Sequence, residues 1–227
     1  MLSITEENYL KALFRLTCEN GDQTETGTNE LAAHLNVKPA TASDMLKKLK
    51  EKKLIEYERY GKSSLSKKGL KIATEIVKKH RLWETFLFDK LGFTWDEVHE
   101  VAEQLEHIQS TKLVERLNKL LNYPVIDPHG DPIPQQNGQP VQQIRKTLNE
   151  VAEGETCVII GVNNNSSEFL QYMDKIGLGL NKSIRVVSRH PFDEMMEIEC
   201  RGLKANLTPK VARNIVIATE PLRKKSA

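Results

Sequence analysis

The chain has 227 residues, of which 39% are hydrophobic and 28% charged, and its formal net charge is +2. This balance is typical of a globular protein with several small cores, and no stretch approaches the roughly 20 apolar residues of a membrane helix. The three cysteines are far apart, which argues against a disulfide framework, and Met1–Glu7 lacks the features of an export signal. We therefore expect a cytoplasmic protein that does not associate with a membrane.

Charge is distributed unevenly along the chain. Residues 38–81 contain 14 Lys and Arg but five Asp and Glu, whereas residues 96–107 contain five acids and no Lys or Arg. A basic block followed by an acidic one indicates a surface for a polyanion next to a site that attracts cations. Two solvated helix faces would give the same pattern, so that alternative stays open.

The first third of the chain has the pattern of a winged helix-turn-helix. Ser3 and Glu6 form a predicted capping box at the start of the first helix. Thr28 is the predicted cap of a second helix over 29–35, and Pro39 suits the first turn of a third helix. The order of helix, turn and helix is that of a DNA-reading unit, although such units also serve as protein-interaction modules.

The third helix has its apolar positions on one face, which leaves the other face exposed. That face begins with small and polar side chains and continues with lysines, which suits insertion into a major groove of DNA. Two short strands over 54–58 and 63–66 follow, and a turn at Tyr60–Lys62 would make a basic wing. The predicted DNA-binding residues are Lys38, Pro39, Ala40, Thr41, Ser43, Asp44, Lys47, Lys48 and Lys62.

The middle third places ionisable side chains on faces that are otherwise apolar. In a helix over about 70–91, His80 and Glu84 fall inside the apolar stripe. In the next helix, four residues share an arc of about 100° beside the apolar face, namely His99, Glu103, Glu106 and His107. Such groups are costly to bury unless something pairs with them.

A divalent cation would relieve the repulsion among these carboxylates and satisfy the buried imidazoles. Because no thiolate is among them, the donor set suits manganese or ferrous iron better than a structural zinc. A plain salt-bridge network, or a core histidine that is only hydrogen-bonded, would explain the same residues without a metal. No metalloprotease motif, nucleophile triad or glycine-rich phosphate loop stands out, so we do not expect an enzyme.

Residues 122–141 contain five of the nine prolines, which predicts an extended linker. Beyond it, short β-branched runs predict strands over 156–160, 183–187, 196–200 and 215–217, with a helix near 167–176. The expected fold is mainly α with a small C-terminal β-barrel of about 70 residues. The expected domains are a winged helix-turn-helix (1–72), a helical dimerisation and metal-binding domain that includes the linker (73–141), and the β domain (142–227).

Taken together, these features resemble the diphtheria-toxin-repressor family of metal-dependent transcriptional regulators. The resemblance rests on the basic winged helix-turn-helix, then His80-x-x-x-Glu84, then His99-x-x-x-Glu103-x-x-Glu106-His107, and it covers essentially the whole chain. It implies a homodimer, an SH3-like C-terminal domain, and manganese as the cofactor with ferrous iron as the alternative. It also implies a pseudo-palindromic double-stranded DNA operator, and repression of metal-uptake genes when metal is bound.

The resemblance further implies two metal sites. The regulatory site would use Glu103, Glu106 and His107, with Asn8 from the first helix completing it. The neighbouring site would use His80, Glu84 and His99, with further ligands from the linker and the β domain at Asp127, His129 and Glu168 beside Asn165. The family carries Met or acids on the first helix, whereas this chain has Asn8 and Lys11. An asparagine carbonyl ligates a hard cation without adding charge, and Lys11 is expected to pair with an acid.

Two other functions fit the residues. One is a winged-helix regulator that responds to a small organic ligand and holds its metal only structurally. The other is a metal-buffering protein or a metal-dependent hydrolase. DNA binding measured with and without manganese separates these functions from metal-activated regulation.

Overall fold

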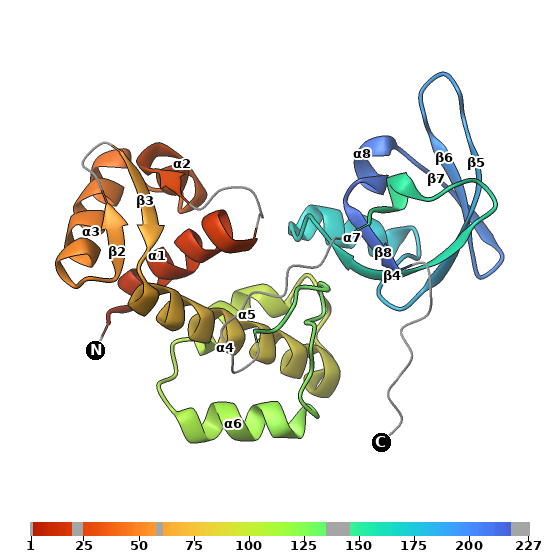
Figure 1. Cartoon of the computed structure of the whole chain (residues 1–227). Helices are drawn as coiled ribbons and strands as arrows, with labels where there is room; N and C mark the ends of the chain where they lie inside the picture. The colour runs from red at the N-terminus through yellow and green to blue at the C-terminus, as the bar shows by residue number, and fades with distance from the viewer. Residues whose placement is uncertain (1, 20–24, 58–60, 135–145, 219–227) are drawn as a thin grey trace. The chain divides into compact units, whose positions relative to one another are not determined.

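The computed structural model describes residues 2–19, 25–57, 61–134 and 146–218 (Figure 1). These residues fall into two compact units, each of which combines segments from several parts of the chain. The first unit comprises the described residues within Met1–Trp83, Val101–Val125 and Pro132–Gln142, and the second those within Glu84–Glu100, Ile126–Asp131 and Gln143–Ala227.

The first unit begins with a winged helix-turn-helix. Its elements are α1 (Ile4–Phe14), β1 (Thr26–Gly27), α2 (Thr28–His34), α3 (Pro39–Glu51), β2 (Ile55–Tyr57) and β3 (Lys62–Leu65). The strands form an antiparallel sheet in the order β1-β3-β2, and α2 and α3 pack against each other (Figure 1). Fully buried Leu10, Leu31 and Leu46 join the three helices in one core.

The predicted starts of the first and third helices are confirmed, and that of the second is corrected by one residue. The helix expected over about 70–91 begins earlier, at Lys67. Ser3 and Glu6 form the capping box of α1, and Pro39 lies in the first turn of α3. The prediction that Thr28 caps α2 is wrong, because Gly27 is the N-cap and Thr28 is already helical. The extended chain of β1 pairs with β3 and ends at Gly27, which sets the start of the helix. The predicted turn at Tyr60 lies partly outside the described residues.

Three further helices follow, α4 (Lys67–Leu91), α5 (Val98–Leu105) and α6 (Thr111–Leu120). In α4, His80 and Glu84 are 1% and 2% exposed, which confirms that both lie in its buried stripe. Among the described helices, none combines the length and apolar character that crossing a bilayer requires. Residues 122–134 contain no helix, as predicted, and the rest of the predicted linker lies outside the described residues.

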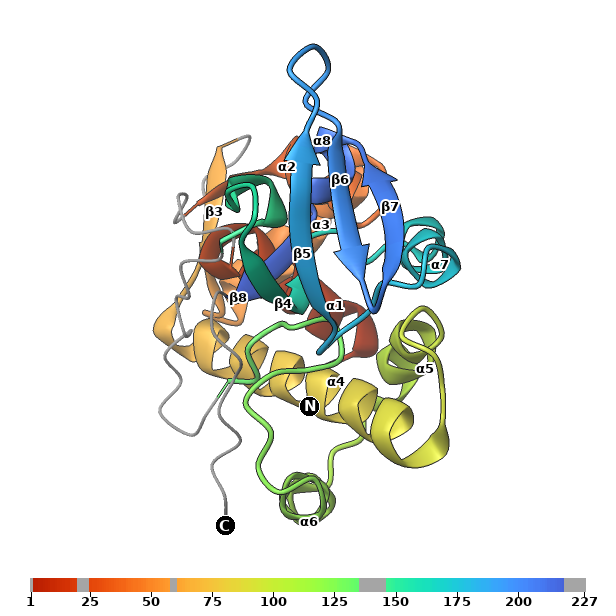
Figure 2. The same cartoon turned by 90° about the vertical axis from the view of Figure 1, so that its right-hand side faces the viewer.

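The β domain of the second unit contains β4 (Thr156–Val162), α7 (Ser167–Lys175), β5 (Ser183–Arg189), β6 (Met196–Cys200), β7 (Leu203–Leu207), α8 (Pro209–Ala212) and β8 (Ile215–Ala218). Its antiparallel sheet has the order β7-β6-β5-β4-β8, and Figure 2 shows β5, β6 and β7 side by side. All four predicted strands and the predicted helix are present. The sheet of the described residues is open, with β7 and β8 at its edges, rather than the closed barrel that we expected.

Candidate metal centres

Glu106 lies just beyond α5, and its side chain is fully buried. Its Oε2 atom lies 2.5 Å from Nδ1 of His80 and 2.8 Å from Nζ of Lys11. Burial alone would raise the pKa of Glu106, but the close contact with His80 and the charge of Lys11 hold that pKa below its usual range. The carboxyl group is therefore an anion in the core of the first unit.

The other oxygen of Glu106, Oε1, is buried and has no hydrogen-bond partner among the described residues. Oδ1 of Asn8, on α1, is in the same state. A buried oxygen without a donor costs about 1–3 kcal/mol, and more when it carries charge. The oxygen of Glu106 belongs to an anion, which indicates that a cation belongs beside it.

His107 is held in an orientation that suits metal binding. Its Nδ1 atom lies 2.6 Å from Oε2 of Glu7, on α1, whose Oε1 accepts a hydrogen bond from Gln109. Nε2 lies 3.7 Å from Oε1 of Glu106. Ligand atoms about 2.1 Å from a shared ion lie about 3–4 Å apart, so this pair fits one ion. Metal-ligating histidines commonly donate their other ring N–H to a carboxylate, which is the place of Glu7.

Lys11 completes this group of side chains. Its ammonium contacts Oε1 of Glu103 as well as Oε2 of Glu106, which confirms the expectation that Lys11 pairs with an acid. We call this group the α1–α5 centre, and it consists of Glu7, Lys11, His80, Glu103, Glu106 and His107. All of its residues belong to the first unit.

A second group of ligands lies in the second unit. One ligand atom each from Glu84, Asp127 and His129 lies within 4.8 Å of the others, and all three residues are buried. Oε1 of Glu84 accepts a hydrogen bond from Nδ1 of His99 at 3.1 Å and lies 3.7 Å from Nδ1 of His129. We call these four residues the linker centre. Oxygen and imidazole donors at these separations suit a divalent cation.

The backbone holds the linker centre in place. Oδ1 of Asp127 accepts hydrogen bonds from the backbone N–H groups of His129 and Asp131, both at 2.8 Å. The carbonyl of His129 in turn accepts a hydrogen bond from the backbone N–H of Val162 on β4. Gly130 has φ +85°, and a Cβ there would lie 2.2 Å from the carbonyl oxygen of Ile160. Only glycine permits this close approach, which anchors the segment on the sheet.

His129 faces the ligands with one nitrogen only. Its Nε2–H donates to the carbonyl of Trp95 at 2.7 Å, which leaves Nδ1 towards Glu84 and Asp127. Burial would lower the pKa of His129, but the carboxylates of Glu84 and Asp127 and the Trp95 carbonyl raise it to about 9. Without a metal, a proton on Nδ1 is thus the counter-charge of the two acids.

Two ligands expected in the neighbouring site have surroundings of their own. His80, expected in the neighbouring site, contacts Glu106 of the α1–α5 centre. Glu168 is exposed in the first turn of α7, outside the cluster of Glu84, Asp127 and His129, and Asn165 is exposed just before that helix.

Glu7, which contacts His107, was not predicted from the sequence. Its position three residues before Leu10 and seven before Phe14 puts an acid in the buried stripe of α1.

The predicted DNA-binding residues lie on the exposed side of α3 and on the wing. Ala42 and Leu46 are buried, whereas the predicted residues of α3 are exposed except Ser43, which is half-buried and hydrogen-bonds Tyr57 at 3.1 Å. Lys47 pairs with Asp44 at 2.8 Å, and both side chains remain largely in solvent. Lys62 on β3 is also exposed. This surface is free to approach phosphates.

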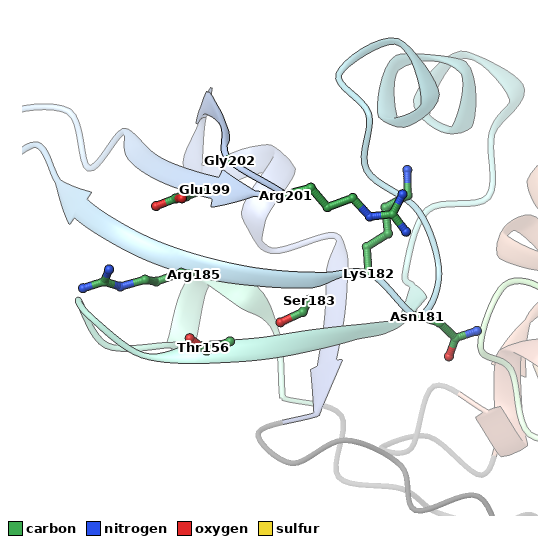
Figure 3. A pocket seen from close by; sticks show the side chains of 8 residues that line it. All are labelled: Thr156, Asn181, Lys182, Ser183, Arg185, Glu199, Arg201 and Gly202. Atoms are coloured by element: carbon green, nitrogen blue, oxygen red, sulfur yellow. The ribbon is translucent and has the colours of Figure 1, made fainter.

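The β domain also has a hollow of about 560 Å³. Arg185 points to the opposite side from Lys182 and Arg201, so the basic side chains do not converge on one position (Figure 3). The lining residues are exposed or half-buried, namely Thr156, Asn181, Lys182, Ser183, Arg185, Glu199, Arg201 and Gly202. The two centres above are therefore the stronger candidates.

Comparison with known proteins gives three family models along the chain. Residues 1–62 match the N-terminal DNA-binding domain of iron-dependent repressors, and residues 66–135 match their metal-binding and dimerisation domain. Residues 146–219 match the FeoA domain. The models therefore follow one another in the order expected from the sequence.

Individual relatives agree with these models. The iron-dependent repressor IdeR of Mycobacterium tuberculosis is 32% identical over 130 residues, which is 57% of this chain and 55% of that protein. The chain thus spans about half the length of such curated relatives. An uncharacterized HTH-type transcriptional regulator of Methanocaldococcus jannaschii is 35% identical over 116 residues, 51% of this chain and 91% of that protein.

A solved structure matches nearly the whole chain. It is a manganese-dependent transcriptional repressor in complex with manganese, 33% identical, with a TM-score of 0.79 over 93% of this chain and 98% of that one. Members of this family are DNA-binding regulators rather than enzymes. The chain belongs to the diphtheria-toxin-repressor family of metal-dependent transcriptional regulators.

Proposed function

We propose that this protein is a repressor that binds a pseudo-palindromic operator as a homodimer when manganese is bound, with ferrous iron as the alternative metal. The observation that carries this function is the composition of the α1–α5 centre. Glu7 and Lys11, on α1 of the DNA-binding domain, contact His107 and Glu106, which follow α5 of the dimerisation domain. Oε1 of Glu106 is buried and has no hydrogen-bond partner among the described residues. The proposed domains remain 1–72, 73–141 and 142–227.

Asn8, Glu106 and His107 would hold the regulatory ion, with Glu103 beside them. An ion there would supply positive charge to the oxygen of Glu106 that has no hydrogen-bond partner among the described residues, and its proposed ligands come from both domains. Glu7 orients His107 through Nδ1, and His80 orients Glu106 through Oε2. A set of carboxylate, amide and imidazole ligands suits manganese and ferrous iron. The manganese complex among the similar structures favours manganese.

The angle between the DNA-binding and dimerisation domains controls DNA binding in this proposal. In a dimer, two recognition helices must lie about 34–36 Å apart, or a multiple of that spacing, to enter successive major grooves. A ligand shifts such an equilibrium only if it binds one arrangement better than the other. Side chains from both domains meet the ion only in one arrangement, so loading selects the spacing that fits DNA. Genes for metal uptake are the proposed targets.

The linker centre would hold a second ion through Glu84, His99, Asp127 and His129. Its ligands come from α4, α5 and the segment anchored on β4, so an ion there would stabilise the junction among them. Glu168 remains a proposed additional ligand.

A mobility-shift titration tests the function directly. Full-length protein treated with EDTA should not shift an operator duplex, and Mn²⁺ should restore a shift that corresponds to dimers. Binding that ignores Mn²⁺ but responds to a small organic molecule would favour the regulator with a structural metal. Mn²⁺ uptake without any DNA binding would favour metal buffering or hydrolysis, and would contradict the proposal.

Replacing Lys47 and Lys62 by glutamine should weaken binding to operator and random DNA alike, because both ammonium groups are exposed on the proposed phosphate-binding surface. The slope of log affinity against log salt should fall by about 0.9 for each phosphate that is no longer neutralised. Lys204→Gln with Lys210→Gln is the matched control, since both lysines are exposed in the β domain and Lys204 also has an acidic partner. An unchanged slope in the first variant would place the DNA elsewhere.

A further inference from the structure

The α1–α5 centre already contains a cation that belongs to the chain. The ammonium of Lys11 lies between Glu103 and Glu106, and the Lys11 side chain is only 6% exposed. Glu103 and Glu106 are three residues apart at the end of α5, so their carboxylates lie on the same face. Glu106 is fully buried and Glu103 is 34% exposed, so without a positive charge between them the two carboxylates would repel each other.

Lys11 contacts only some of the carboxylate oxygen atoms in the centre. It contacts Oε1 of Glu103 and Oε2 of Glu106, whereas Oε1 of Glu106 has no hydrogen-bond partner among the described residues. That second oxygen lies 3.7 Å from Nε2 of His107. The centre therefore has two positions for positive charge on opposite oxygens of one carboxylate, and the chain itself fills one of them.

We propose that the ammonium of Lys11 acts as a built-in cation, so that the α1–α5 centre binds one divalent ion rather than two. This inference rests on the proposed function for the presence of that one ion. In the present chain, two carboxylates meet one ammonium and one divalent ion. With an acid at position 11, three carboxylates would meet two divalent ions, which leaves the same net charge. The residue at position 11 thus sets how many ions the regulatory response requires.

The experiment counts Mn²⁺ ions in the full-length dimer and records their electron paramagnetic resonance spectrum. Glu84→Gln and His129→Ala are present in every sample, so that the linker centre does not contribute. The expected result for this background is one Mn²⁺ per chain with the six-line spectrum of an isolated ion. Adding Lys11→Glu should raise the count to two, and magnetic coupling between neighbouring ions should remove the six-line pattern.

Lys52→Glu in the same background is the matched control. Lys52 also pairs with an acid of α1, Glu6, at 2.6 Å, but this pair lies outside the centre. The Lys52→Glu protein should still bind one Mn²⁺ per chain. Lys11→Gln covers the case in which Lys11→Glu does not fold, because removing the nearby positive charge should raise Mn²⁺ affinity at least about tenfold.

The outcomes separate the inference from the function. A coupled pair of ions with Lys11 intact, or a folded Lys11→Glu protein that still binds one ion, overturns the role of Lys11 and leaves the proposed function standing. Lys11→Gln with equal or weaker Mn²⁺ affinity also overturns that role. A protein with Lys11 intact that binds no Mn²⁺ in this centre overturns both.

Discussion

His107→Ala should abolish Mn²⁺-activated operator binding while the protein remains a dimer. The substitution removes a nitrogen that lies 3.7 Å from Oε1 of Glu106, which has no hydrogen-bond partner among the described residues. It also releases Glu7 from its contact with Nδ1. Removing a residue that only orients a ligand costs about 10–100-fold in metal affinity. We therefore expect the removal of a ligand to cost more than about 100-fold. Val98 and Ala102, the buried apolar residues of α5, are untouched.

The measurement is the Mn²⁺ concentration for half-maximal operator binding, with the oligomeric state followed by sedimentation. Glu106→Gln should behave like His107→Ala, because the amide keeps the shape of the side chain but removes the charge that attracts the ion. His190→Ala is the control, since His190 is an exposed histidine of the β domain that pairs with Asp193. Operator binding by His107→Ala at ordinary Mn²⁺ concentrations would show that His107 is not a ligand.

Glu7→Gln should have a smaller effect than either of these variants. The amide can still contact His107, but it no longer offers a carboxylate to Nδ1–H. An increase of about 10–100-fold in the Mn²⁺ requirement is expected for this loss of orientation. The same titration measures it, and an effect as large as that of His107→Ala would make Glu7 a ligand itself.

The helical pattern alone predicted the candidate ligands on α4 and near α5, because buried charge is visible in such a pattern. The candidate ligands on α1 and in the linker came from the family resemblance. His80 and Glu84 fall in the apolar stripe of α4, and their burial follows directly from that spacing. The wing and α3 were predicted from a different signal, the periodicity of apolar residues, which changes from helical spacing to strand spacing along this segment. β7 was missed because Leu203–Leu207 has no β-branched residue, so only its pairing with β6 makes it a strand.

Which groups meet in three dimensions could not be predicted from spacing. Nothing in the helix pattern shows that Lys11 reaches Glu103 and Glu106, 92 and 95 residues away. The carbonyl of Trp95 that fixes the orientation of His129 is a backbone group, and every residue carries one. The close approach of Gly130 to β4 likewise depends on tertiary packing.

The linker centre makes the metal-free protein sensitive to pH. Its acids raise the pKa of His129 to about 9, above the value of about 6.5 expected for an unfolded chain. The folded state therefore binds the proton on His129 more tightly than the unfolded chain does. The stability that protonated His129 contributes is fully present below about pH 6.5. That contribution is lost as pH rises through about 9. Because His129 is 2% exposed, solvent screens this effect little, and it amounts to at most about 3 kcal/mol.

Glu84→Gln should remove most of this pH dependence, because Glu84 is the largest favourable contributor to the raised pKa of His129. In EDTA, the free energy of unfolding of the unmutated protein should fall between about pH 6.5 and 9.5, whereas that of Glu84→Gln should change much less. The variant should also bind one Mn²⁺ fewer per chain, since it lacks the carboxylate shared by His99 and His129.

Mn²⁺ binding to the linker centre must displace the proton from Nδ1 of His129, so its apparent affinity should rise up to about tenfold per pH unit below about pH 9. Glu100→Gln is the control for both measurements, because Glu100 is an exposed acid next to His99 on α5. Urea unfolding at several pH values and calorimetric titration with Mn²⁺ give the two quantities. If Glu84→Gln keeps the pH dependence and the ion count of the unmutated protein, neither the proton nor the metal is held by Glu84 and His129.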